Sequence, residues 1–269
     1  MSQSTRFVET SHGKLAYRVA GPAGGVPILL ANRFRGTLDD WDPAFIDALA
    51  QNRTVVAFDS AGIGRSKGEV PGSISGMADV AADLVKVLGL GKVDLLGWSL
   101  GGIVAQTVAL DHPQIVRRLI VAGSSPGGVK DGPQQHSRVP EVMSHPVNGE
   151  EDFLFLFFPE TETARAAGRA YFKRVAEVSD RGPAVTASSF MNQIKAFSAW
   201  EGVRERLPEL KIPVLVANGQ HDVMIPAYRS YVLAQEVLDG KLILYPDAGH
   251  AFLFQYAEDF ALEIERFLS

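Results

Sequence analysis

The pentapeptide Gly97-Trp98-Ser99-Leu100-Gly101 places a serine between two glycines. It follows residues 93–96, a run typical of a buried strand, and precedes small residues typical of a closely packed helix. At a sharp strand-to-helix turn of this kind, the serine hydroxyl is lifted above the sheet edge. Glycine suits the flanking positions because the backbone bends tightly and neighbouring elements pack closely there. The pattern predicts that Ser99 is the nucleophile of an acyl transfer.

A serine hydroxyl becomes nucleophilic when a nearby base takes its proton. Asp222 follows the strand-like run 214–217, and His250 follows the run 241–245. In an open parallel sheet such loops gather at the carboxyl edge, so these side chains are expected to meet Ser99. We predict that His250 is the base and that Asp222 orients the imidazole. The chain order of serine, acid and histidine is the order associated with this turn.

Other titratable residues fit these roles less well. Asp247 lies on the histidine's own loop, and His221 adjoins Asp222, where neighbours in an extended loop point apart. Gly62-Ile63-Gly64 lacks a third glycine at the spacing of a dinucleotide loop, so we interpret it as a structural turn. The chain has no cysteine and no His-Glu-x-x-His string, and we predict neither a metal nor a cofactor.

Strand-like and helix-like runs alternate along most of the chain. Several strand-like runs are unbroken aliphatic stretches, which is typical of a sheet covered by helices on both faces. We predict an α/β fold with a mostly parallel, doubly wound sheet of about eight strands. The expected strands are 7–10, 14–19, 26–31, 54–58, 93–96, 116–122, 214–217 and 241–245, and the expected helices are 43–50, 75–88, 100–111, 227–238 and 257–267.

The alternation stops between about Ser124 and Leu207, where no strand is evident. We predict a helical cap at 124–207, inserted into a core formed by 1–123 and 208–269. The helical stretches expected within the insertion are 151–158, 160–178 and 188–207.

Composition narrows the class of protein. The chain has 269 residues, 46% of them hydrophobic, and a net charge of −5 without blocks of like charge. We therefore expect a small-molecule substrate and no nucleic-acid or membrane partner. The first residues lack the apolar core of a signal peptide, which favours a cytoplasmic location. The sequence does not indicate an oligomeric state.

Together these features resemble the α/β-hydrolase superfamily, specifically its members with a helical cap. The resemblance implies an oxyanion hole formed by the backbone amides of Leu100 and Phe34. The loop that carries Phe34 departs from the family, because Asn32-Arg33 stands where relatives usually carry His-Gly. The matching stretches are Gly97 to Gly102, Asp59 to Ser66, Asn218 to Asp222 with Pro226, and Gly249-His250.

Two arginines and several aromatic residues are candidates for the substrate pocket. Arg33 or Arg35 would bind a substrate anion if either side chain turned inward, whereas we favour surface pairing with Asp39 or Asp40. Trp98 and Phe252 are expected to line an apolar pocket. Phe155 and Phe158 are expected above them, although core packing explains all of these except Trp98 equally well.

The leading hypothesis is a serine hydrolase that cleaves an ester, thioester or lactone through an acyl-enzyme. Ser99 argues against the dehalogenases and epoxide hydrolases of this fold, which use an aspartate nucleophile. The same three side chains would also serve a cofactor-free perhydrolase or haloperoxidase, or a hydrolase of carbon–carbon bonds. The alternative that is not an enzyme is a ligand receptor with slow or absent turnover.

Overall fold

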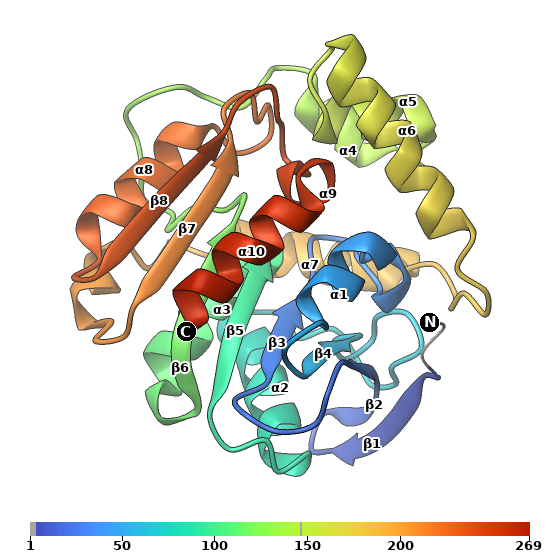
Figure 1. Ribbon diagram of the computed structural model, residues 1–269, viewed down its shortest axis with the longest axis vertical. Helices are drawn as coiled ribbons and strands as arrows, with labels where there is room; N and C mark the ends of the chain where they lie inside the picture. The colour runs from blue at the N-terminus through green and yellow to red at the C-terminus, as the bar shows by residue number, and fades with distance from the viewer. Residues whose placement is uncertain (1–3, 146) are drawn as a thin grey trace.

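An eight-stranded β-sheet forms the centre of the computed structural model, which describes residues 4–145 and 147–269 (Figure 1). Residues 1–3, which belong to the N-terminal stretch that we compared with a signal peptide, lie outside these ranges. The strands are β1 (Arg6–Thr10), β2 (Gly13–Ala20), β3 (Ile28–Ala31), β4 (Val55–Phe58), β5 (Val93–Trp98), β6 (Val116–Ala122), β7 (Val214–Gly219) and β8 (Gly240–Tyr245).

The strands are arranged in the order β1-β2-β4-β3-β5-β6-β7-β8. β2 runs antiparallel to both of its neighbours, and every other neighbouring pair is parallel. This arrangement confirms the predicted mostly parallel sheet. It also brings the carboxyl ends of β3, β5, β7 and β8 to one edge, from which the candidate site residues emerge.

Each face of the sheet has its own hydrophobic core. Successive residues of β5 point to opposite faces, so that Leu95 belongs to one core and Leu96 to the other. Helices cover both faces, which confirms the doubly wound fold. The helices on the Leu95 side are α2 (Ile74–Val87), α3 (Leu100–Asp111) and α8 (Ala227–Glu236), and those on the Leu96 side are α1 (Pro43–Leu49), α9 (Phe252–Gln255) and α10 (Ala257–Leu268).

Residues 123–213, which we call the inserted segment, connect β6 to β7. Within the described part of this segment there are four α-helices and no strand: α4 (Val139–Ser144), α5 (Glu150–Phe157), α6 (Glu162–Ala176) and α7 (Ala187–Ser198). The expected helix at 188–207 is wrong in its second half, because α7 ends at Ser198 and Gly202 has a left-handed φ of 101°. The six-residue α4 was not predicted.

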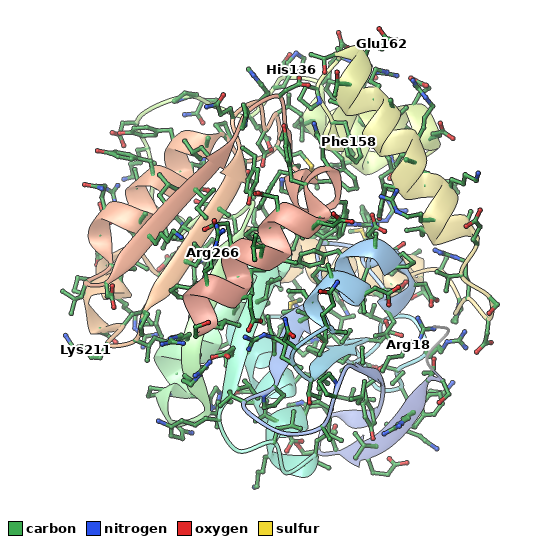
Figure 2. All side chains as sticks on the ribbon, in the orientation of Figure 1. Arg18, His136, Phe158, Glu162, Lys211 and Arg266 are labelled. Atoms are coloured by element: carbon green, nitrogen blue, oxygen red, sulfur yellow. The ribbon has the colours of Figure 1, made fainter. Side chains whose placement is uncertain are left out.

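The inserted helices α4, α5 and α6 lie together at the top of Figure 1. Lys211, just before β7, and Glu162, at the start of α6, are labelled at opposite ends of Figure 2, so α6 lies toward the carboxyl end of β7. None of the helices in the described ranges is both long and apolar enough to traverse a bilayer.

Candidate active site

Ser99 sits between the end of β5 and the start of α3 with a φ of 58°, a left-handed conformation that few non-glycine residues adopt. Its neighbours explain the two glycines of the motif. A Cβ atom on Gly97 would lie 2.1 Å from the Gly101 carbonyl oxygen, and one on Gly101 would lie 2.0 Å from the Ala31 carbonyl oxygen. The turn therefore tolerates no side chain at either position.

His250 and Asp222 meet although 28 residues separate them in the chain. His250 Nδ1 lies 2.7 Å from Asp222 Oδ2, and both side chains are fully buried. The other carboxylate oxygen of Asp222 accepts the backbone N–H groups of Met224 and Ile225, each at 2.8 Å. Three contacts thus fix the carboxylate, and the carboxylate in turn orients the imidazole.

The second nitrogen of the imidazole is directed differently. His250 Nε2 is buried and has no hydrogen-bond partner among the described residues. Ser99 and His250 line the same cavity of about 470 Å³. No hydrogen bond joins the Ser99 hydroxyl to Nε2, and catalytic hydrogen bonds often tighten only when substrate binds. The structure therefore places Ser99 and His250 at one cavity, and Asp222 contacts His250 without lining it, so that one of the two expected contacts is formed.

Asp247, the alternative acid, lies elsewhere. Its Oδ1 accepts the hydroxyl of Thr161 at 2.7 Å, whereas the carboxylate that pairs with His250 Nδ1 is that of Asp222. His145 pairs with Asp152, and the described residues contain no group of three or more acidic or histidine side chains arranged for a metal ion.

Trp98 and Phe252 do not line the cavity, contrary to expectation. Both side chains are fully buried. Trp98 is the last residue of β5 and points into the Leu96-side core, where its Nε1–H donates to the His250 carbonyl at 2.9 Å. Trp98 therefore supports the loop that carries His250. Phe252 packs against Tyr245 in the same core.

The cavity wall provided by the inserted segment also differs from expectation. Phe158 is buried in the core and Phe155 is absent from the lining, whereas Phe153 and Phe157 contribute to it. The Phe157 ring lies 5.9 Å from that of His250. On a short amphipathic helix, a small error in phase exchanges the residues that face the cavity with those that face away.

The loop opposite Ser99 is built by Asn32 and Arg33. Asn32 Oδ1 accepts the Arg33 N–H at 2.8 Å, Asn32 Nδ2 donates to the Thr37 carbonyl at 2.6 Å, and the Gly36 N–H donates to the Arg33 carbonyl at 3.0 Å. Asn32 thereby closes a tight turn that presents Phe34 to the cavity. On the other side, Leu100 is the first residue of α3, where backbone N–H groups lack intrahelical acceptors.

The favoured interpretation placed Arg33 at the surface, but this residue is buried, with 9% exposure. It does approach Asp40, with Nη2 3.6 Å from Oδ2, and Nη1 donates to the Phe34 carbonyl at 2.8 Å. Its guanidinium lies over three rings, with centroid distances of 5.7 Å to Trp98, 5.5 Å to Phe153 and 5.4 Å to Phe157.

Arg35 connects this loop to the inserted segment. Its N–H donates to Gln193 Oε1 at 3.0 Å, and its Nη1 donates to the His145 carbonyl at 3.1 Å and to Asn148 Oδ1 at 3.2 Å. Burial, and secondarily the charge of Arg33, lowers the pKa of the Arg35 guanidinium. The partners lie more than 100 residues away, so no local sequence signal predicts these contacts.

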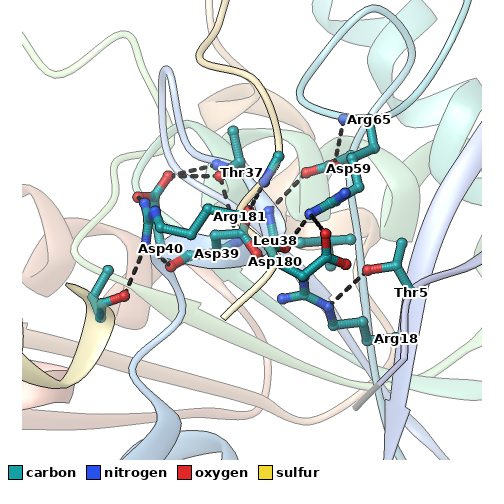
Figure 3. Close-up of polar contacts among 12 residues, drawn as sticks. Thr5, Arg18, Thr37, Leu38, Asp39, Asp40, Asp59, Arg65, Asp180 and Arg181 are labelled. Carbon is teal, nitrogen blue, oxygen red and sulfur yellow. Dashed lines mark hydrogen bonds and ion pairs between the residues drawn. The ribbon is translucent and has the colours of Figure 1, made fainter. Parts of the chain in front are cut away.

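A second set of polar contacts fixes residues 37–40 (Figure 3). Asp59 accepts the Leu38 N–H at 2.7 Å and the Arg65 N–H at 2.9 Å, and burial raises the pKa of Asp59 to about 6. From the inserted segment, Arg181 Nη1 donates to the Asp39 carbonyl at 3.1 Å. Arg181 also lines the cavity, and the sequence reasoning missed it.

Comparison with known proteins identifies the family to which this chain belongs. The family model described as alpha/beta hydrolase fold matches residues 26–256. An α/β hydrolase fold protein from Chitinophaga pinensis superposes with a TM-score of 0.91 at 32% identity, over 100% of this chain and 98% of that one. An Azorhizobium caulinodans protein provisionally named carbamate hydrolase RutD is 29% identical over 242 residues, 88% of each chain. The human serine hydrolase BPHL is 25% identical over 95% of this chain and 83% of its own. The chain therefore belongs to the α/β hydrolase fold family and is a hydrolase of that fold.

Proposed function

We propose that this hydrolase cleaves an ester, thioester or lactone of a small organic substrate through an acyl-enzyme on Ser99. The observation that carries the proposal is the buried Asp222–His250 pair, whose free Nε2 shares a cavity with a serine held in a strained turn. A buried, oriented imidazole beside a hydroxyl is the arrangement that activates a serine nucleophile.

The proposed reaction begins when His250 Nε2 takes the Ser99 hydroxyl proton while Oγ bonds to the substrate carbonyl carbon. The carbonyl π electrons move to its oxygen, and the backbone N–H groups of Leu100 and Phe34 stabilise that oxyanion. As the intermediate collapses, the bond to the leaving group breaks and His250 delivers the proton to it. A water molecule then repeats the sequence on the acyl-enzyme, with His250 as base, and releases the acid and free Ser99.

The remaining assignments belong to the same proposal. Residues 124–207 act as a cap over a core formed by 1–123 and 208–269, because α5 supplies Phe153 and Phe157 to the lining of the cavity that Ser99 also lines. The reaction described requires neither a metal nor an organic cofactor. Trp98 acts through the His250 loop as a positioning residue.

The test is the mass of the protein during turnover of a p-nitrophenyl ester. Rapid quenching of the wild-type chain is expected to reveal an acyl adduct on the peptide that contains Ser99. Ser99→Ala abolishes both the adduct and hydrolysis, whereas Ser144→Ala, at an exposed serine in α4, leaves both intact. Hydrolysis that persists in Ser99→Ala contradicts the proposal. Exclusive formation of a peracid from acetate and peroxide, or cleavage of only a dienone acid, contradicts the ester assignment.

A further inference from the structure

The guanidinium of Arg33 has unused hydrogen-bonding capacity inside the candidate active site. Its Nε is buried without a hydrogen-bond partner, and among the described residues Nη2 donates no hydrogen bond. The nearest carboxylate to Nη2 is Asp40, at 3.6 Å, beyond hydrogen-bonding distance. Buried donors without acceptors are costly, so a ligand that supplies acceptors would be bound favourably.

Asp40 forms an ion pair with Arg33 at 3.6 Å, but its hydrogen bonds are made to other residues. Its Oδ2 accepts the Thr37 N–H at 2.7 Å and the Thr37 hydroxyl at 3.1 Å, and its Oδ1 lies 3.4 Å from Arg181 Nη2. These contacts hold the carboxylate at the start of a short helical turn. The guanidinium therefore keeps its planar edge available for another anion.

The charges of the cavity lining favour an anionic occupant. The charged side chains that line it are one carboxylate, Asp40, and three guanidinium groups, those of Arg33, Arg35 and Arg181. Burial, and secondarily the charge of the neighbouring Arg33, lowers the pKa of Arg35. The lining thus carries more positive than negative charge, which attracts a negative group into the cavity.

Arg33 also lies beside the proposed reacting groups. Its guanidinium packs on the rings of Trp98 and Phe157, and the same two rings lie 5.8 Å and 5.9 Å from the His250 ring. The aromatic contacts fix the guanidinium without using its N–H groups. Arg33 and His250 are thus two polar groups on one apolar cluster, facing one cavity.

We propose that Arg33 binds a substrate carboxylate, so that the preferred substrates are esters or lactones that carry a free carboxylate besides the scissile bond. A guanidinium matches a carboxylate through paired charge-assisted hydrogen bonds, which a neutral acyl chain cannot form. The substrate class rests on the proposed function, whereas the anion site rests on the contacts of Arg33. The two are separated by measuring turnover and binding independently.

The turnover test compares two p-nitrophenyl esters with acyl chains of equal carbon number, the neutral valerate and the anionic monoglutarate. The wild-type chain is expected to have the higher kcat/KM for the monoglutarate. Arg33→Met lowers the monoglutarate value about 10- to 100-fold more than it lowers the valerate value. Arg33→Lys, which keeps the charge but not the planar fork, gives an intermediate loss. The control Arg266→Met, at an exposed arginine of α10, changes neither.

The binding test uses calorimetry to measure how tightly Ser99→Ala binds monomethyl glutarate, with methyl valerate as the neutral comparison. If Ser99→Ala binds the anion more tightly than the neutral ester and Ser99→Ala/Arg33→Met does not, the anion site is supported. This holds even if the wild-type chain turns over neither nitrophenyl ester. Such a lack of turnover would overturn only the proposed function. Equal binding of both ligands overturns the anion site. An equal loss of turnover for both esters in Arg33→Met and Arg33→Lys also overturns it, because that pattern indicates a structural role.

Discussion

The two walls of the cavity are built by different physical means. On one wall stands His250, supported by Asp222; the two residues follow adjacent strands β8 and β7, whose pairing fixes where both loops begin. On the other wall, the loop with Arg33 and Arg35 is held by polar contacts to the inserted segment. We call these the strand wall and the loop wall. The strand wall is specified by sheet register, and the loop wall by hydrogen bonds between distant parts of the chain.

This difference explains where function is expected to vary. Strand register depends on many apolar contacts, so a single substitution rarely shifts it. A loop held by a few polar contacts changes with each of them. We therefore expect the chemistry of the reaction to depend on the strand wall and substrate choice on the loop wall. Four substitutions test this division.

The largest effect is expected on the strand wall, for Asp222→Asn. The amide cannot hold the imidazole in the tautomer that accepts the Ser99 proton, so kcat for an activated ester should fall by about 10⁴-fold. The matched control is Asp247→Asn, which alters the carboxylate on the histidine's own loop and should change kcat less than about twofold. Equal effects of the two substitutions would reassign the acid.

Gly101, in the turn that carries Ser99, packs against the start of the loop wall: an added Cβ would lie 2.0 Å from the Ala31 carbonyl oxygen and 2.6 Å from the Asn32 carbonyl oxygen. Gly101→Ala should lower the free energy of unfolding by about 3 kcal/mol or more, because both neighbours are backbone atoms. Chemical denaturation measures this change. Gly72→Ala, where the nearest atom is the end of the Lys195 side chain at 3.9 Å, should cost less than about 0.5 kcal/mol. A tolerated Gly101→Ala would show that the loop wall can move away from the turn that carries Ser99.

A pH-dependent effect is expected at the base of the loop wall. The pKa of Asp59 is about 6 in the folded chain, above the 3.8 of an exposed aspartate, so the folded state holds the proton more tightly. Stability from this group is present at low pH and is lost as pH rises from about 4 to about 6, by an amount of the order of 3 kcal/mol. The free energy of unfolding of the wild type relative to Asp59→Asn should fall across that range. A relative stability that is flat with pH would refute this account of Asp59.

The smallest effect is expected for Gln193→Ala, which removes the acceptor of the Arg35 N–H. Losing one buried hydrogen bond costs about 1 kcal/mol, so kcat/KM should fall about fivefold while strand-wall residues are untouched. Steady-state kinetics measures this loss. The exposed Gln134→Ala is the control and should leave kcat/KM within about twofold of the wild-type value. An unchanged kcat/KM in Gln193→Ala would mean that the loop wall does not depend on this contact.

The success of sequence-based prediction follows the same division. The positions of Ser99, Asp222 and His250 at strand ends were predictable because aliphatic runs locate strands and parallel strands end at one edge. The two-faced core follows from the same pattern, whereas the strand order was not predicted, because aliphatic runs do not say which strands are neighbours.

The loop wall was less predictable. Arg33 lies over Phe153 and Phe157, and Arg35 contacts Gln193, all of them residues of the inserted segment. Neither contact leaves a periodic signal, since each joins residues more than 100 positions apart. The burial of Trp98 was missed because residues at a strand end can face either the core or the loops, and periodicity does not distinguish the two.

The central claim is that Ser99 is the nucleophile of this hydrolase, and covalent labelling tests it most directly. The folded chain is treated with a fluorophosphonate, which reacts with activated serines, and the labelled peptide is identified by mass spectrometry. We predict a single label on Ser99 that is absent in Ser99→Ala and strongly slowed in Asp222→Asn. Labelling of another serine, or no labelling of a chain that hydrolyses esters, would contradict the account.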